Sequence, residues 1–398
     1  MTPLAIVGVR VWDGEAEEPS RDPLTIRVED ERIAAIGASP ELVSGAETVS
    51  FEGATALPGL MDAHVHLTLD PKIRSVEDQD KVDDAERERV MAERARAMVR
   101  AGITTARDLG GGAWRELALR DRIVAGEISG PRILCAGQPV TCPKGHCWFW
   151  GGEAANEGEI RAVVARQVDH AVDWIKVMAT GGVITKGTNP GDPQFETAEL
   201  SAVVAEAGRY GLPVAAHCHG TEGIRRAAEA GVRTIEHCSF VGGEGFGSGL
   251  DREVAKRIAA RGAWVSPTVN AGWKRFLAPE SKLAAFGTRM SEVLQGLRSE
   301  GVRLIASTDA GIPGVEHHRL PEALAVFAAL AKLSNADALR SATSEAARAL
   351  GIDATTGALR PGLAADILVV DGDPLGDLAA LQKPLLVLAR GRLIPAGP

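Results

Sequence analysis

The sequence predicts an α/β fold, a (β/α)8 TIM barrel with a small β-sandwich built from both chain termini. In the middle of the chain, short apolar runs alternate eight times with longer stretches of helical pattern, which is typical of parallel strands joined by right-handed crossovers. At both ends, short runs of strand-forming residues are separated by turn residues. We therefore expect residues 1–57 and 359–398 to form the sandwich and residues 58–358 to form the barrel.

Length and composition agree with this fold and limit the function. The 398 residues suffice for a barrel of about 250 residues and a second, smaller domain. A net charge of −9 argues against a nucleic-acid partner, and no run of about 18 apolar residues is present to span a membrane. The first ten residues lack the basic and apolar regions of a signal peptide, so we expect a cytoplasmic protein. Assembly into a homo-oligomer stays open.

The sandwich strands are expected to be short and to come from both ends of the chain. Near the start, the pattern predicts strands over residues 4–12, 24–28, 32–36 and 48–51. Near the end, it predicts strands over residues 366–370 and 385–389. Because the first four are too few to enclose a core, we expect the two groups to pair with each other.

The barrel strands are expected at the eight apolar runs. These runs cover residues 56–66, 104–109, 132–137, 174–180, 213–219, 234–239, 264–269 and 303–310. The helical stretch over residues 76–100 is dense in charged side chains, which is typical of a solvated outer face. In such barrels the active site lies at the C-terminal ends of the strands. Functional side chains are therefore expected where these runs end.

Two histidines separated by one residue end the first barrel run. Residues i and i+2 of a strand point to the same face, so His64 and His66 can be aimed at one metal ion. An isolated His-x-His pair is common without a metal, but further candidate ligands lie in later runs. They are Lys176 in the fourth run, His217 at the end of the fifth, His237 at the end of the sixth and Asp309 at the end of the eighth. Imidazole and carboxylate ligands suit zinc or a similar divalent ion.

Lys176 is unusual because it lies inside an apolar strand. Burial of an ammonium group is costly, and it lowers the pKa of a lysine. A neutral amine can react with carbon dioxide to form a carbamate, whose oxygens can bridge two cations. The alternative is an ion pair between Lys176 and a neighbouring carboxylate such as Asp173 or Glu236.

Such a site supports hydrolysis of an amide bond. Two metal ions can polarise a carbonyl group and lower the pKa of a bridging water molecule. Asp309, at the edge of the metal site, would take the proton of that water and pass it to the leaving nitrogen. The sequence therefore predicts an enzyme that acts on a small-molecule amide.

Several motifs resemble the amidohydrolase superfamily with a carbamylated-lysine binuclear centre, in its prolidase-like, Xaa-Pro dipeptidase-related branch. They are Asp-Trp-Ile-Lys-Val-Met-Ala-Thr-Gly-Gly at residues 173–182, Ala-Ala-His-Cys-His-Gly at 215–220, Thr-Ile-Glu-His at 234–237 and Pro-Gly-Leu-Ala-Ala-Asp-Ile-Leu-Val at 361–369. The resemblance implies two divalent ions, taken here as Zn²⁺. One ion would be held by His64, His66, Lys176 and Asp309, and the other by Lys176, His217 and His237.

Three further residues are candidates for substrate contacts. Strand alternation would aim His219 in the same direction as His217, and because the family ligand is the first histidine of this motif, we expect His219 to contact substrate or support a ligand. His146 resembles a family Gly-His segment that faces substrate and is a candidate catalytic hydrogen-bond donor, with a solvent-exposed loop histidine as the alternative. Dipeptidase relatives often use a tyrosine beyond the sixth strand to bind the α-carboxylate, and here Phe240 occupies that stretch.

Other side chains near the expected site are less specific. Trp148 belongs to an aromatic cluster over residues 148–150, which can form an apolar wall for a bulky substrate, or cap the barrel or fill a subunit contact. Residues 317–319, His-His-Arg, could form an anion clamp. Five cysteines without an export signal indicate reduced thiols, and the pair Cys142 and Cys147 lacks the second pair of a zinc ribbon.

The leading functional hypothesis is a metal-dependent amidohydrolase that cleaves the amide of a dipeptide or an N-acyl amino acid. The alternative within enzymes is hydrolysis of a non-peptide C–N bond, in a cyclic amide, a urea or carbamate, or a heterocycle that is deaminated. A metal-storage or interaction protein is disfavoured, because storage does not need an aspartate poised at an activated water.

Overall fold

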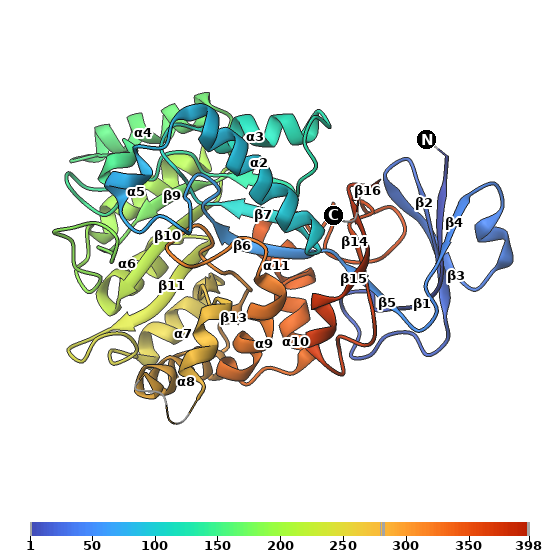
Figure 1. Cartoon of the computed structure of the whole chain (residues 1–398). Helices are drawn as coiled ribbons and strands as arrows, with labels where there is room; N and C mark the ends of the chain where they lie inside the picture. Colours follow the sequence, from blue (N-terminus) through green and yellow to red (C-terminus); the bar gives the residue numbers. More distant parts are fainter. Residues whose placement is uncertain (1, 279, 281–282, 396–398) are drawn as a thin grey trace.

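The computed structural model describes residues 2–278, 280 and 283–395, and it shows helices arranged around parallel strands, with a separate sheet at one side (Figure 1). The sheet at the side contains strands from both chain ends. From the N-terminal end come β1 (Leu4–Val11), β2 (Leu24–Glu29), β3 (Arg32–Gly37), β4 (Glu47–Ser50) and β5 (Thr55–Pro58). From the C-terminal end come β14 (Ile367–Val370), β15 (Pro384–Ala389) and β16 (Arg392–Leu393).

These strands form one mixed sheet in the order β16-β15-β14-β5-β1-β2-β3, with β4 paired to β1. The first half of β1 pairs in parallel with β4, and its second half pairs in parallel with β5. The register is broken between Ile6 and Val9, where Gly8 has a φ of 78° that favours glycine. The predicted pairing of both chain ends is thus confirmed, but the strands form one hydrogen-bonded mixed sheet instead of the expected sandwich. Its two halves contribute to one apolar cluster that includes Ile26 and Ile367.

The central strands are parallel and fall into two sheets. One sheet contains β6 (Leu60–Val65), β7 (Ile103–Asp108) and β8 (Arg132–Cys135). The other contains β9 (Ile175–Met178), β10 (Val214–Gly220), β11 (Thr234–Val241), β12 (Trp264–Ser266) and β13 (Arg303–Leu304). All eight expected runs therefore contain a strand, although several strands are shorter than expected.

Backbone hydrogen bonds connect the two sheets on both sides. The nitrogen of Met178 in β9 donates to Val140 O, 2.8 Å away, in the segment that follows β8. On the other side, the nitrogen of His66 donates to Ala310 O at 2.7 Å, and the nitrogen of Asp309 donates to His64 O at 2.9 Å. The end of β6 and the segment after β13 therefore lie side by side, which positions the first and last candidate ligands together.

The helices follow the strands in alternation, as the pattern predicts. They are α1 (Val76–Gln79), α2 (Asp84–Arg100), α3 (Arg115–Val124), α4 (Glu157–Asp169), α5 (Thr197–Gly208), α6 (Thr221–Ala230), α7 (Arg252–Arg261), α8 (Ala284–Ser299), α9 (Leu320–Ala331), α10 (Asn335–Ser341) and α11 (Ser344–Leu350). The expected helix over residues 76–100 is interrupted, because the carboxylate of Asp83 caps a new helix by accepting from Glu86 N. Within the described residues, we find no helix whose length and apolar character would let it cross a membrane.

The last expected barrel strand ends early near the site. The sequence pattern predicts a strand over residues 303–310, but β13 ends at Leu304. Beyond it, Thr308 donates from both its backbone nitrogen and its hydroxyl group to the buried carboxylate of Asp62, at 3.1 and 2.5 Å. These hydrogen bonds to a side chain take the place of regular strand pairing at Thr308. The next residue is Asp309, whose φ is 61°.

Candidate metal centre and active site

Three potential metal ligands meet at the ends of β6 and of the segment after β13. The Nε2 atoms of His64 and His66 are 3.3 Å apart. A carboxylate oxygen of Asp309 lies 3.4 Å from each of these two nitrogens. The three side chains therefore present two nitrogens and one oxygen to a common point, as a cation site requires.

Hydrogen bonds orient both imidazoles of this first cluster. The Nδ1 of His64 donates to the carboxylate of Glu236 at 3.0 Å, and the Nδ1 of His66 donates to Gly110 O at 2.7 Å. With the proton held on Nδ1, each ring keeps the lone pair on Nε2, which faces the common point. Metal-binding histidines are usually fixed in this way by a carboxylate or a carbonyl group.

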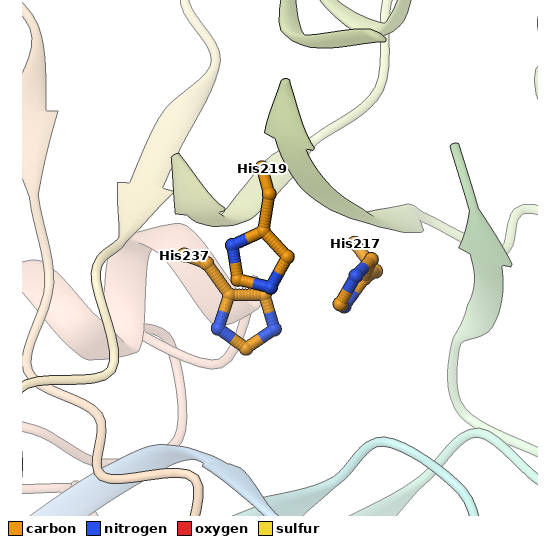
Figure 2. A group of neighbouring side chains, drawn as sticks. All are labelled: His217, His219 and His237. Carbon is orange, nitrogen blue, oxygen red and sulfur yellow. The ribbon is translucent and has the colours of Figure 1, made fainter. Parts of the chain in front are cut away.

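A second cluster lies on β10 and β11, where His217, His219 and His237 come together (Figure 2). One ring nitrogen of each lies within 4.8 Å of the others. The ring of His219 is stacked on that of His237, with centroids 4.5 Å apart. Sequence reasoning gave only His217 and His237 as ligands, and the structure brings His219 equally close.

Each imidazole of the second cluster also has a fixed partner. The Nε2 of His217 donates to Gly181 O at 3.1 Å, which leaves the lone pair on Nδ1. The Nδ1 of His237 lies 2.9 Å from the hydroxyl group of Thr268. The Nδ1 of His219 lies 2.7 Å from the hydroxyl group of Ser239, a residue that itself lines the cavity. All three rings therefore have one nitrogen left for a ligand or a substrate.

Lys176 lies in β9 with a side chain that is almost fully buried and lines the same cavity. Burial lowers the pKa of its amine to about 8, so the neutral form is accessible near physiological pH. The carboxylates expected as alternative partners each form another ion pair in the described part of the chain, although the charge of Glu236 still attracts Lys176. Asp173 pairs with Arg120 at 3.1 Å, and Glu236 pairs with Arg107 at 2.8 Å.

A buried ion pair between Arg107 and Glu236 supports the first cluster through the bond of Glu236 to His64. Arg107 donates to the carboxylate of Glu236 at 2.8 Å and to the hydroxyl group of Thr234 at 2.9 Å, and neither charged side chain is exposed. Burial would raise the pKa of Glu236, but Arg107 and His64 outweigh this effect and the pKa is lowered. Glu236 is therefore an anion that can hold the imidazole of His64. The sequence pattern did not reveal the role of Arg107.

The backbone of β11 departs from regular strand geometry at the second cluster. His237, Cys238 and Phe240 have φ values of 64°, 48° and 45°, in a region that residues with side chains rarely adopt. Strained residues of this kind are concentrated at functional sites. Side chains still alternate here, with His237 and Ser239 at the cavity and Phe240 on the opposite face, so the prediction that Phe240 contacts substrate needs correction. Phe240 is fully buried in the main core, and the cavity is lined by Ser239 instead.

Both clusters open into a cavity of about 1300 Å³. His146 lies in its wall, with its ring 4.5 Å from that of His217 and its Nδ1 buried without a partner among the described residues. Burial lowers the pKa of His146 to about 3, so its imidazole is neutral. The ring fits because Gly182 has no side chain, since a Cβ there would lie 2.3 Å from it.

Comparison with known proteins agrees with this arrangement. The model of the amidohydrolase family matches residues 55–394. The chain belongs to the amidohydrolase family. It is therefore a metal-dependent hydrolase of C–N bonds with two His-rich metal sites.

Similar proteins cover almost the whole amidohydrolase chain. Ochratoxinase from Aspergillus niger is 27% identical over 419 residues, which span 93% of this chain and 82% of that protein. A crystal structure of that ochratoxinase superposes with a TM-score of 0.83 at 26% identity, covering 98% of this chain and 95% of the other. A Xaa-Pro dipeptidase with methionine bound in its active site superposes with a TM-score of 0.86 at 28% identity, covering 98% and 99%.

The possible anion clamp is not found at the amidohydrolase site, whereas the reduced thiols expected of the cysteines are found. The segment 317–319 does not form an anion clamp: His317 is buried and its Nε2 donates to His66 O at 3.0 Å, while Arg319 pairs with Glu322 at 2.5 Å. Cys142 and Cys147 are free thiols and belong to neither metal-ligand group within the described ranges. Through its hydrogen bond, His317 holds the backbone carbonyl group of His66, which is a candidate metal ligand.

The aromatic loop lines the cavity, in agreement with one of its open alternatives, the apolar wall, but sequence reasoning missed a second aromatic wall. Trp148 lines the cavity and is 44% exposed, and the ring of Trp150 lies 5.5 Å from that of His66. The missed wall is formed by Phe246, Trp273, Phe276 and Phe286. Trp273 and Phe276 share a short 3-10 helix (Ala271–Phe276), but Phe246 and Phe286 come from two other segments, so no spacing in the sequence could have grouped all four.

Proposed function

We propose that this amidohydrolase cleaves the amide bond of a dipeptide or an N-acyl amino acid with two zinc ions. The observation that carries the proposal is the pair of adjacent imidazole clusters. One nitrogen of each ring is held by a hydrogen bond, so that the other nitrogen is directed towards the cluster. The similarity to a Xaa-Pro dipeptidase over nearly the whole chain supports a substrate of the amino-acid type. The central strands would form one closed (β/α)8 barrel within residues 58–358, flanked by a terminal domain from residues 1–57 and 359–398.

The residues present fit two divalent ions. One ion would be held by four side chains, which are His64, His66, Lys176 and Asp309. The other would be held by Lys176, His217 and His237. Because the Lys176 amine is buried and its pKa is lowered, it can add carbon dioxide and lose a proton to give a carbamate anion. This anion would offset part of the positive charge of both ions.

The chain's own groups would carry the proton and place the substrate. When bound, the two ions would polarise the substrate carbonyl and lower the pKa of a water molecule. Asp309 would accept the proton of that water on a carboxylate oxygen and pass it to the leaving nitrogen. The pKa of Asp309 is lowered to about 2, because the attraction of His64 and His66 outweighs burial, so this carboxylate is ionised at neutral pH. Neutral His146, and His219 beside it, would donate hydrogen bonds to the carbonyl oxygen or a carboxylate.

Release of free amino acid tests this proposal. Zinc-reconstituted protein would be incubated with a library of dipeptides, N-acyl amino acids, cyclic amides, ureas and carbamates. We expect amino-acid release from members of the first two groups, its loss on chelation and its return with zinc. Turnover confined to cyclic amides, ureas or carbamates would contradict the substrate class and support hydrolysis of a non-peptide C–N bond.

A further inference from the structure

Four aromatic side chains form a continuous wall on one side of the cavity, which we call the four-ring wall. Phe286 is its centre, with ring centroids 4.6 Å from Phe276, 5.3 Å from Trp273 and 6.2 Å from Phe246. These pairs are edge-to-face or tilted, the arrangement that aromatic rings prefer. Phe246, Trp273 and Phe286 are only partly buried, so their ring surfaces remain available within the cavity.

The four-ring wall is adjacent to one of the two ligand clusters. The ring of Phe246 meets that of His219 edge to face at 5.3 Å. The other aromatic wall, which contains Trp148 and Trp150, contacts the opposite cluster, where the ring of Trp150 is 5.5 Å from that of His66. Each ligand cluster is therefore in contact with a different aromatic surface of the cavity.

The position of Asp309 gives the two surfaces different roles. If Asp309 passes a proton to the leaving nitrogen, the amine half of the substrate lies beside the cluster of Asp309, His64 and His66. The amine half is then near the wall that contains Trp150. The acyl half extends in the other direction, past His219 towards Phe246.

We propose that the four-ring wall is the acyl subsite and that it selects amides with an aromatic acyl group. This inference rests on the proposed function for the direction of the substrate. A flat aryl group can stack on or pack against the edges of several rings at once, whereas a small alkyl acyl group leaves these surfaces in contact with water. No ionisable group is needed for this selection.

A two-by-two set of substrates tests the assignment of the two walls. The four amides are the N-acetyl and N-phenylacetyl derivatives of L-alanine and L-phenylalanine, and kcat/KM is measured for each with zinc-reconstituted protein. The acyl preference is the ratio of phenylacetyl to acetyl, and the amine preference is the ratio of phenylalanine to alanine. We expect the wild-type protein to prefer phenylacetyl.

Variants on each wall should shift different ratios. Phe286→Leu and, at an independent position, Phe246→Leu keep apolar bulk but remove a ring, so we expect each to lower the acyl preference by about 3-fold to 10-fold. Trp148→Leu should lower the amine preference instead. Tyr210→Ala is a matched control, because Tyr210 is a 45% exposed aromatic residue that does not line the cavity, and it should change neither ratio. Equal losses for all four substrates in both phenylalanine variants, or a shift of the amine preference, would overturn the subsite.

Binding of product acids separates this inference from the proposed function. Phenylacetate and acetate would be titrated into the same zinc-reconstituted proteins by calorimetry. We expect wild-type protein to bind phenylacetate more tightly than acetate, and Phe286→Leu to reduce that difference while Tyr210→Ala does not. If no amide is hydrolysed but this pattern holds, the proposed function is wrong and the aryl subsite stands. If amides are hydrolysed and Phe286→Leu leaves phenylacetate binding unchanged, the subsite is wrong and the function stands.

Discussion

Glu236→Gln is the change that most directly tests how the fold supports the first ligand cluster. Glu236 accepts from Arg107 at 2.8 Å and from His64 at 3.0 Å, and the side chains of all three residues are at most 1% exposed. The amide removes the negative charge that is paired directly with the buried Arg107 guanidinium. Loss of one partner of a buried ion pair costs about 3–5 kcal/mol, and we expect the lower end because the amide oxygen can still accept a hydrogen bond.

The same substitution should also weaken metal binding through His64. A glutamine can present its NH₂ group to Nδ1 of His64, which favours the tautomer with the proton on Nε2 and removes the lone pair that faces the site. Removing such an outer partner typically costs 10-fold to 100-fold in metal affinity. We expect the protein's affinity for one of its two zinc ions to fall by a factor in this range.

Two measurements check this prediction. Chemical denaturation gives the free energy of unfolding, and competition with a chromophoric chelator gives zinc affinity. Glu253→Gln is the matched control, because Glu253 pairs with Lys256 on the surface at 2.7 Å and both are more than half exposed. The control should match wild type in both assays. Wild-type stability together with wild-type zinc affinity in Glu236→Gln would refute the reasoning.

Three further predictions follow from single side chains. Lys176→Ala should lose binuclear metal binding, with partial rescue by short carboxylic acids, and two full zinc equivalents measured in the purified variant would contradict a bridging role. Asp309→Asn should keep most metal but lose about 10²-fold to 10⁴-fold in kcat, because an amide cannot accept the proton, and turnover within a few-fold of wild type at equal metal content would identify another base. Burial raises the pKa of the Glu116 carboxyl group from 4.5 to about 8, so its contribution to stability is full below pH 4.5 and is lost as pH rises through about 8. The free energy of unfolding of Glu116→Gln should lack this decrease, and parallel pH profiles for wild type and variant would show that Glu116 ionises normally.

Strand periodicity was sufficient to place most of the candidate ligands. His64 and His66 lie on one face because they are two residues apart, and the parallel strands bring His217 next to His237. The contact expected of Phe240 came from the resemblance to a family tyrosine, whereas alternation from His237 places Ser239 at the cavity. Three residues of this segment adopt positive φ values, which depend on tertiary contacts and cannot be inferred from alternation.

The parts of the site that could not be predicted depend on contacts between distant segments. Arg107 meets Glu236 across 129 positions of the chain, and in sequence it stands beside another charged residue, Asp108, with nothing that indicates its partner. Phe246 and Phe286 likewise meet only because a loop and α8 cover the same side of the cavity. In the terminal sheet, the change of partner along β1 depends on the break at Gly8, and the alternating pattern does not encode it.

Amide hydrolysis as a function of bound zinc tests the central claim most directly. Metal-depleted protein would be titrated with zinc while amino-acid release from N-phenylacetyl-L-phenylalanine is followed and bound metal is measured. We predict that the initial rate rises until two equivalents per chain are bound and then stays constant. Full activity without bound metal, or no amino-acid release with two equivalents bound, would contradict a binuclear amidohydrolase of this substrate class.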